Sequence, residues 1–296
     1  MAMHPPHKTR AHWALGIAAL ATVACGSLER RDGGPAPDAF FFAGQSNAVG
    51  FDSGASDLPP SGLDASIALW WRCGDPPPDD ADSQSGGWTH LGPQWRGEPK
   101  AKGSEPRQYG NFAHPEGGYG PEVSMMRALA TKDPTRPLGA IKVAFSGTSL
   151  DDWNPVDPVG ACYRVFVDEA RRALTEKPMA PRALAWIQGE SDANAEDAPR
   201  YAARLRRLIA SLRRDLAAPD LVVLLAVNTR FGMGKNPYVA DIVDAQREVA
   251  AADPLCTYVD TARATIANGA HFDAQGTRDV GRWLADAYAP LTVPVQ

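Results

Sequence analysis

Four short segments contain most of the side chains in this sequence that could do chemistry. They are GQSN at residues 44–47, SGTSL at 146–150, WIQGESD at 186–192 and HFDAQG at 271–276. The first holds a serine hydroxyl, which attacks a carbonyl carbon when a general base takes its proton, and the last holds an imidazole that could be that base. Each segment is ordinary alone, since such serines often cap helices. The set is therefore more informative than any member.

Backbone and amide groups near these segments could stabilise a developing negative charge. Gly44 permits a sharp turn before Ser46, so that the hydroxyl projects and N–H groups face a substrate carbonyl. Gly147 could donate a further backbone N–H. Gln188 and Glu190 place an amide and an acid directly after an apolar run, a position that helix capping does not explain.

The hydrophobic pattern predicts the elements that position these groups. Strands are expected at residues 38–43, 139–145, 182–187, 221–227 and 257–259, and helices at 121–131, 161–175, 201–216, 236–250 and 274–288. Alternating strands and helices indicate an α/β fold whose parallel sheet is covered on both sides. Ligands bind at the carboxyl ends of such strands, where the four segments fall.

A long stretch at about residues 52–118 breaks this alternation. It is rich in Pro, Gly, Asp, Ser and Trp and has little periodicity, so it is interpreted as an irregular insertion over the active-site face. Two interpretations of its Trp70, Trp71, Trp88 and Trp95 stay open: contact with substrate, or packing in local clusters.

The bulk composition limits the possible partners. The chain has 296 residues, of which 44% are hydrophobic, and a formal net charge of −5. This length suits one large domain. The charge provides no basic stripe for a phosphate backbone, so nucleic acid is not an expected partner.

The first residues predict export. Lys8 and Arg10 precede an apolar run at residues 13–24 that ends at Cys25, which is typical of a signal peptide over residues 1–25. This run resembles a bacterial lipobox, although Thr22 replaces the usual leucine. Lipidation of Cys25 would attach the protein to the periplasmic or cell-surface face of a membrane; the alternative is secretion. Residues 26–37 then form a polar tether, and residues 38–296 the domain.

Three further cysteines are Cys73, Cys162 and Cys256. An oxidising compartment would permit one disulfide among them, but the sequence does not specify the pair. Their spacing matches no metal site, and no metal or other cofactor is expected.

The four segments, together with Gly120-Pro121-Glu122, resemble the SGNH hydrolase superfamily. They are most similar to carbohydrate esterases of family six and sialate O-acetylesterase-like proteins, and the resemblance runs from Phe40 to Tyr288. It implies a three-layer α/β/α sandwich and removal of acetyl groups from carbohydrates such as acetylxylan or acetylated sialic acid.

The resemblance also implies site residues. Ser46 matches the nucleophile and His271 the general base. Gly147 and Gln188 match contributors to an oxyanion hole beside the Ser46 N–H. Gln45 and Asn47 would shape the turn around the nucleophile.

One position departs from the family pattern. The superfamily has D-x-x-H, with the aspartate orienting the histidine, whereas this chain has Asn268. Asparagine can hold the ring but cannot stabilise an imidazolium as a carboxylate does. Glu190 could supply the carboxylate, with Asp192 a weaker candidate; alternatively the site is a Ser–His dyad, or it has lost activity.

The function likewise has alternatives. A non-catalytic glycan-binding protein on the same fold is motivated by Asn268 and the tryptophan-rich insertion. An esterase acting on other small acyl esters, or a lipase- or thioesterase-like enzyme, would use the same Ser46 and His271. The sequence determines neither the sugar nor the oligomeric state.

Overall fold

The computed structural model describes Met1 and residues 36–97 and 112–291. The predicted signal peptide, its Cys25 lipobox and residues 26–35 of the tether lie outside this part of the chain. No helix within the described ranges is long and apolar enough to cross a membrane.

A mostly parallel sheet forms the centre of the molecule. Its strand order is β3-β2-β5-β1-β6-β7-β8, with β4 also paired to β2. The parallel strands are β2 (Ala68–Gly74), β5 (Leu138–Phe145), β1 (Asp38–Gly44), β6 (Ala180–Ile187), β7 (Val222–Ala226) and β8 (Cys256–Tyr258). The short β3 (Ser83–Gln84) and β4 (Thr89–His90) run antiparallel to β2. The first strand of the domain is therefore central.

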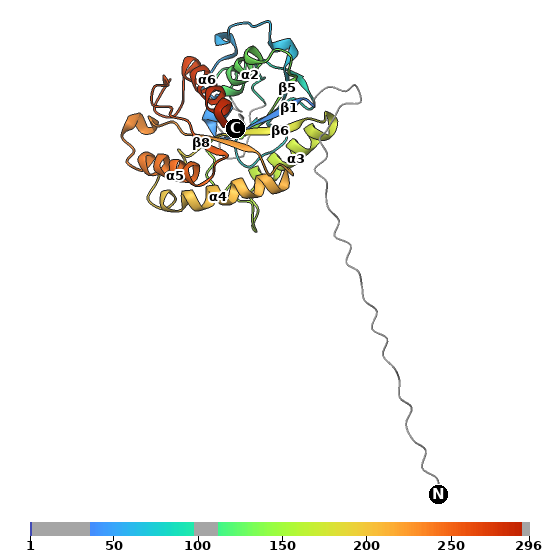
Figure 1. Ribbon diagram of the computed structural model, residues 1–296. Helices are drawn as coiled ribbons and strands as arrows, with labels where there is room; N and C mark the ends of the chain where they lie inside the picture. Colours follow the sequence, from blue (N-terminus) through green and yellow to red (C-terminus); the bar gives the residue numbers. More distant parts are fainter. Residues whose placement is uncertain (2–35, 98–111, 292–296) are drawn as a thin grey trace.

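Helices cover both faces of this sheet (Figure 1), which confirms the three-layer α/β/α fold. One face carries α2 (Pro121–Lys132) and α6 (Ala274–Leu291). The other carries α3 (Ala161–Glu176), α4 (Ala198–Asp215) and α5 (Tyr238–Ala252). Short helices α1 (Ser46–Val49), η1 (Ala55–Asp57), η2 (Asp64–Ser66) and η3 (Phe231–Gly234) lie in the loops.

Strand β1 is buried along its whole length because both faces of the sheet are covered. Phe41 packs into the core beneath α3 to α5, whereas Phe40 and Phe42 pack into the core beneath α2 and α6. This follows from the alternation of side chains along a strand. The apolar run at residues 38–43 thus anchors the turn that follows it.

The prediction of an irregular stretch over residues 52–118 is wrong for part of its length. Residues 68–74 form β2, which pairs with β5 inside the sheet. Trp70 and Trp71 alternate between the two cores, and the Trp88 indole N–H donates to the Ala173 carbonyl. Local packing is therefore the correct interpretation for these three. Trp95 is exposed, at 44% of its surface.

The cysteines inside the domain are all reduced. Cys73, Cys162 and Cys256 are buried and free, so the disulfide that the sequence permits among them does not form. Burial raises the pKa of the Cys73 and Cys256 thiols to about 12. At neutral pH these thiols are therefore protonated and unreactive.

Gly44 cannot be replaced without strain. It ends β1 with φ +135°, and an added Cβ would lie 2.1 Å from the Ile187 carbonyl oxygen. We expect Gly44→Ala to lower the free energy of unfolding by about 3 kcal/mol or more, as measured by urea denaturation. Gly62→Ala is the control, because no heavy atom lies within 4 Å of its Cβ position; it should change stability by about 0.5 kcal/mol or less. Equal midpoints for the two variants would contradict this account.

Candidate active site

The turn after β1 places Ser46 at the carboxyl edge of the central strand. Gln45 N donates to the Ile187 carbonyl (3.1 Å), and α1 begins at Ser46. The Ser46 carbonyl accepts from the N–H groups of Gly50 and Phe51 at 2.9 and 3.1 Å. First-turn N–H groups have no partner within a helix, so the Ser46 amide is available to a ligand.

His271 is held by a carboxylate that the sequence analysis did not identify. Its Nδ1 lies 2.6 Å from Asp52 Oδ2, and both side chains are largely buried, at 14% and 17% exposed. The Phe51 ring stacks obliquely on the imidazole, with centroids 4.7 Å apart. These contacts fix the ring and leave its Nε2 for another partner.

Asp52 is ionised at neutral pH. Burial raises the pKa of its carboxyl group, but hydrogen bonds from His271 and Asn268 outweigh this effect and lower the pKa below its ordinary value. A charged carboxylate against Nδ1 is the arrangement that stabilises an imidazolium.

Asn268 supports the carboxylate, and none of the hydrogen bonds of its side chain goes to the imidazole ring. Its Nδ2 donates to Asp52 Oδ2 (2.7 Å), while its Oδ1 accepts from the backbone N–H groups of Ala270 and His271. The residue at the D-x-x-H position thus holds both the His271 backbone and the carboxylate that bonds the ring.

The expectation that Glu190 orients His271 is wrong. The Glu190 carboxylate is buried, and its Oε1 accepts from Asn47 Nδ2 (2.7 Å) and from the Asn228 N–H (3.0 Å). Burial raises the pKa of Glu190, and its Oε2 has no hydrogen-bond partner among the residues that the structure describes. Its hydrogen bonds hold Asn47 in place, whereas the ring is bonded to Asp52.

Asn47 connects the nucleophile turn to the histidine loop. Its Nδ2 donates to the Ala270 carbonyl (3.0 Å), and its Oδ1 accepts from the Phe272 N–H (2.9 Å). Asn47 therefore forms hydrogen bonds with the backbone of both residues that flank His271. Within the described part of the chain no hydrogen bond joins Ser46 Oγ to the imidazole; such catalytic bonds often form only once substrate is bound.

Gln188 does not contribute to an oxyanion hole in this structure, contrary to expectation. It is fully buried, and its amide nitrogen donates to the Thr148 carbonyl (3.0 Å) and to Asp192. Both amide hydrogens are thus occupied. Burial raises the pKa of Asp192 to about 6. Its carboxyl group accepts a hydrogen bond from Gln188, and among the described residues it makes no hydrogen bond to His271.

The parts expected of Gly147 and Gln45 stay predictions, and the structure gives their surroundings. Gly147 is exposed on the loop after β5, and no heavy atom lies within 4 Å of its Cβ position. Gln45 is buried, and its Oε1 accepts from the N–H groups of Gly189 and Ser191 at 3.4 and 3.3 Å.

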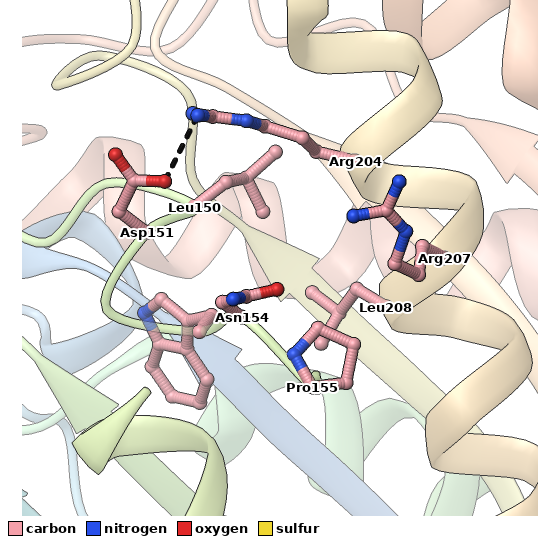
Figure 2. A pocket seen from close by; sticks show the side chains of 8 residues that line it. Leu150, Asp151, Asn154, Pro155, Arg204, Arg207 and Leu208 are labelled. Carbon is pink, nitrogen blue, oxygen red and sulfur yellow. Dashed lines mark ion pairs between the residues drawn. The ribbon is translucent and has the colours of Figure 1, made fainter. Parts of the chain in front are cut away.

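The loop that contains Gly147 is anchored by Asp192 and by an ion pair to α4, which Figure 2 shows. The Leu150 N–H donates to both oxygens of Asp192 (3.1 and 3.2 Å), and Asp151 forms an ion pair with Arg204 of α4 at 2.9 Å. A cavity of about 100 Å³ lies beneath this pair. Ser46 and His271 do not line it, so it flanks the site without containing it.

Asp52 was missed because nothing in its local pattern marks it. It follows Ser46 on the same turn, at the start of the stretch interpreted as irregular. The asparagine in D-x-x-H is the one sequence feature that points to it. If His271 is paired with a carboxylate, that carboxylate has to come from another loop at the carboxyl edge of the sheet. The described residues contain no group of three or more His, Cys, Asp or Glu arranged to hold a metal.

The chain is similar to several solved structures. A protein from Arabidopsis thaliana superposes with a TM-score of 0.64 at 19% identity, covering 86% of this chain and 99% of that one. NanS gives 0.59 at 15% identity, with 86% and 98% covered. A carbohydrate acetylesterase from Xanthomonas citri gives 0.54 at 16% identity, with 86% and 56% covered. At such identities the likeness shows the shared fold.

The family comparison covers nearly the whole domain. Residues 36–290 match the model of the family described as "Carbohydrate esterase, sialic acid-specific acetylesterase". No curated protein sequence matches the chain. The family match includes the turn at Ser46, the carboxylate at Asp52 and the loop at His271. The chain therefore belongs to the sialic acid-specific acetylesterase family of carbohydrate esterases, and it is a carboxylic ester hydrolase.

Proposed function

We propose that this enzyme removes O-acetyl groups from carbohydrates through a Ser46–His271–Asp52 site. The observation that supports it most directly is the 2.6 Å hydrogen bond between His271 and Asp52, because Asp52 lies on the same turn as Ser46. The proposed substrate is an acetylated oligo- or polysaccharide, in line with the family and its neighbours.

The geometry suggests a double-displacement mechanism. His271 Nε2 takes the proton of Ser46 as Oγ attacks the acetyl carbonyl carbon, and Asp52 stabilises the imidazolium. The N–H groups of Ser46 and Gly147 hold the oxyanion. The imidazolium then protonates the departing sugar oxygen, leaving an acetyl-serine. Water, deprotonated by His271, attacks this ester, and acetate leaves as Ser46 regains its proton.

A non-catalytic glycan-binding role loses its main motivation. It rested largely on the asparagine at position 268, where the superfamily has an aspartate. Asp52 provides a carboxylate that bonds His271 instead, and Asn268 donates to it. The export signal predicted over residues 1–25 would further favour action outside the cytoplasm.

Loss of the nucleophile should abolish turnover. We expect Ser46→Ala to lower kcat for 4-nitrophenyl acetate by at least about 10³-fold, with an unchanged circular dichroism spectrum. Ser56→Ala, at an exposed serine that bonds Glu116, should keep full activity. Acetate release from an acetylated oligosaccharide by the Ser46→Ala enzyme would remove Ser46 from its role.

Two carboxamide substitutions separate the orienting carboxylate from the structural one. Asp52→Asn should lower kcat by about 10⁴-fold, because the neutral amide favours the wrong imidazole tautomer. Glu190→Gln keeps an oxygen that can accept from Asn47 and Asn228, so we expect a loss of about tenfold or less. Steady-state kinetics on both variants would decide, and the opposite ranking would restore Glu190 as the orienter.

The stabilising effect of Asp52 should depend on pH. Because its pKa lies below the ordinary value of 3.8 in the folded state, its ionised form stabilises the fold above that pH, and the contribution is lost as pH falls through the folded pKa. The stability difference between wild type and Asp52→Asn should thus be largest above about pH 5 and shrink below about pH 4. Urea titrations at several pH values test this, and a difference independent of pH would contradict it.

A further inference from the structure

A buried ion pair lies beneath the nucleophile turn, and the mechanism above does not use it. Lys142 in β5 and Glu122 at the start of α2 both have fully buried side chains, and Lys142 Nζ lies 3.0 Å from Glu122 Oε1. Glu122 is the acid of the Gly-Pro-Glu segment that the sequence analysis singled out.

The ammonium group of Lys142 has three acceptors for its three protons. Besides Glu122, it donates to Gln94 Oε1 (2.8 Å) and to the Val49 carbonyl (2.7 Å). Glu122 Oε1 also accepts from Gln94 Nε2 (2.6 Å) and from the Gly120 N–H (2.9 Å). The charges are therefore compensated, as burial requires.

Stability alone does not account for this pair. Apolar residues of similar volume often replace a buried ion pair with no loss of stability. What they cannot provide is a directed hydrogen bond to Val49, the last residue of α1. A helix of four residues does not hold its own geometry, so this bond supplies a constraint that α1 lacks.

The same turn is braced by the segment before α2. Gly50 ends α1 with φ +82°, and an added Cβ there would lie 2.0 Å from the Tyr119 carbonyl oxygen. A Cβ on Gly120 would lie 2.6 Å from the Ala48 carbonyl oxygen and 2.7 Å from Lys142 Nζ. The backbone of residues 119–120 thus packs directly against the backbone of the turn between Ser46 and Asp52.

We infer that Lys142, paired with Glu122 and Gln94, is a positioning residue that sets the turn joining Ser46 to Asp52 through its hydrogen bond to the Val49 carbonyl. This inference rests on the proposed function, because it matters to catalysis only if both ends of the turn take part. A displacement of about 1 Å in such a turn can cost about 10²-fold in rate.

The test removes both charges together, so that no unpaired ion stays buried. In the double variant Lys142→Met/Glu122→Gln, the glutamine retains an acceptor for Gly120 and Gln94, while Val49 loses its donor. We expect kcat for 4-nitrophenyl acetate to fall about 10²-fold, with KM changed about twofold or less. A folded double variant with wild-type kcat would overturn the inference.

A matched control removes a different ion pair of α2. Arg127 bonds Asp64 in a bidentate pair at 2.7 and 2.6 Å, and the Val49 carbonyl accepts from Lys142 and not from this pair. Arg127→Met/Asp64→Asn should leave kcat within about twofold. An equal loss of kcat in this control would show that general destabilisation is the cause, and would also overturn the inference.

A spectroscopic readout separates positioning from stability. The His271 Nδ1 proton, bonded to Asp52, should give a downfield NMR resonance that shifts or broadens in the double variant and not in the control. If that double variant does not fold, Lys142→Leu/Glu122→Gln removes the same donor to Val49 with a smaller side chain, and an unchanged resonance and kcat there would overturn the inference. Activity that survives Ser46→Ala would instead refute the proposed function, whatever Lys142 does.

Discussion

The hydrogen bond between His271 and Asp52 is the contact on which the rest of the site depends. It joins two segments 219 residues apart in sequence, one directly after the central strand and the other directly before the last helix. Neither segment has regular structure of its own at that point. The sheet brings them together, and Asn47 and Asn268 then hold them in register by hydrogen bonds to the backbone around the imidazole.

The carboxylate that bonds the imidazole lies on the turn after β1 and not on the histidine loop. Asn268 stands at the position of the usual aspartate, and its Nδ2 donates to Asp52 Oδ2, the same oxygen that the imidazole bonds. A second acid, Glu190, lies close by and serves Asn47 and Asn228. The two carboxyl groups have opposite environments: hydrogen bonds lower the pKa of Asp52, and burial raises that of Glu190.

The sequence alone predicted most of the fold, because periodicity is a local property. The continuous apolar run of β7 and the amphipathic pattern of α4 both fall where expected. Strand β2 was missed because its Trp-Trp-Arg-Cys run resembles its irregular surroundings. Ser46 and His271 could be identified from short motifs. The hydrogen-bond partners of Glu190 and Gln188 could not be identified in this way. They depend on which groups, distant in sequence, the sheet brings within about 3 Å.

The shared turn of Ser46 and Asp52 has a consequence for protein engineering. Since the hydroxyl and the carboxylate are covalently linked through one short stretch of backbone, their spacing is preserved when that stretch is transplanted as a cassette. A recipient scaffold would need to supply a strand end, an imidazole from any nearby loop and a buried cation beneath the graft. Fewer independent parts have to be aligned than when the three groups come from three separate loops.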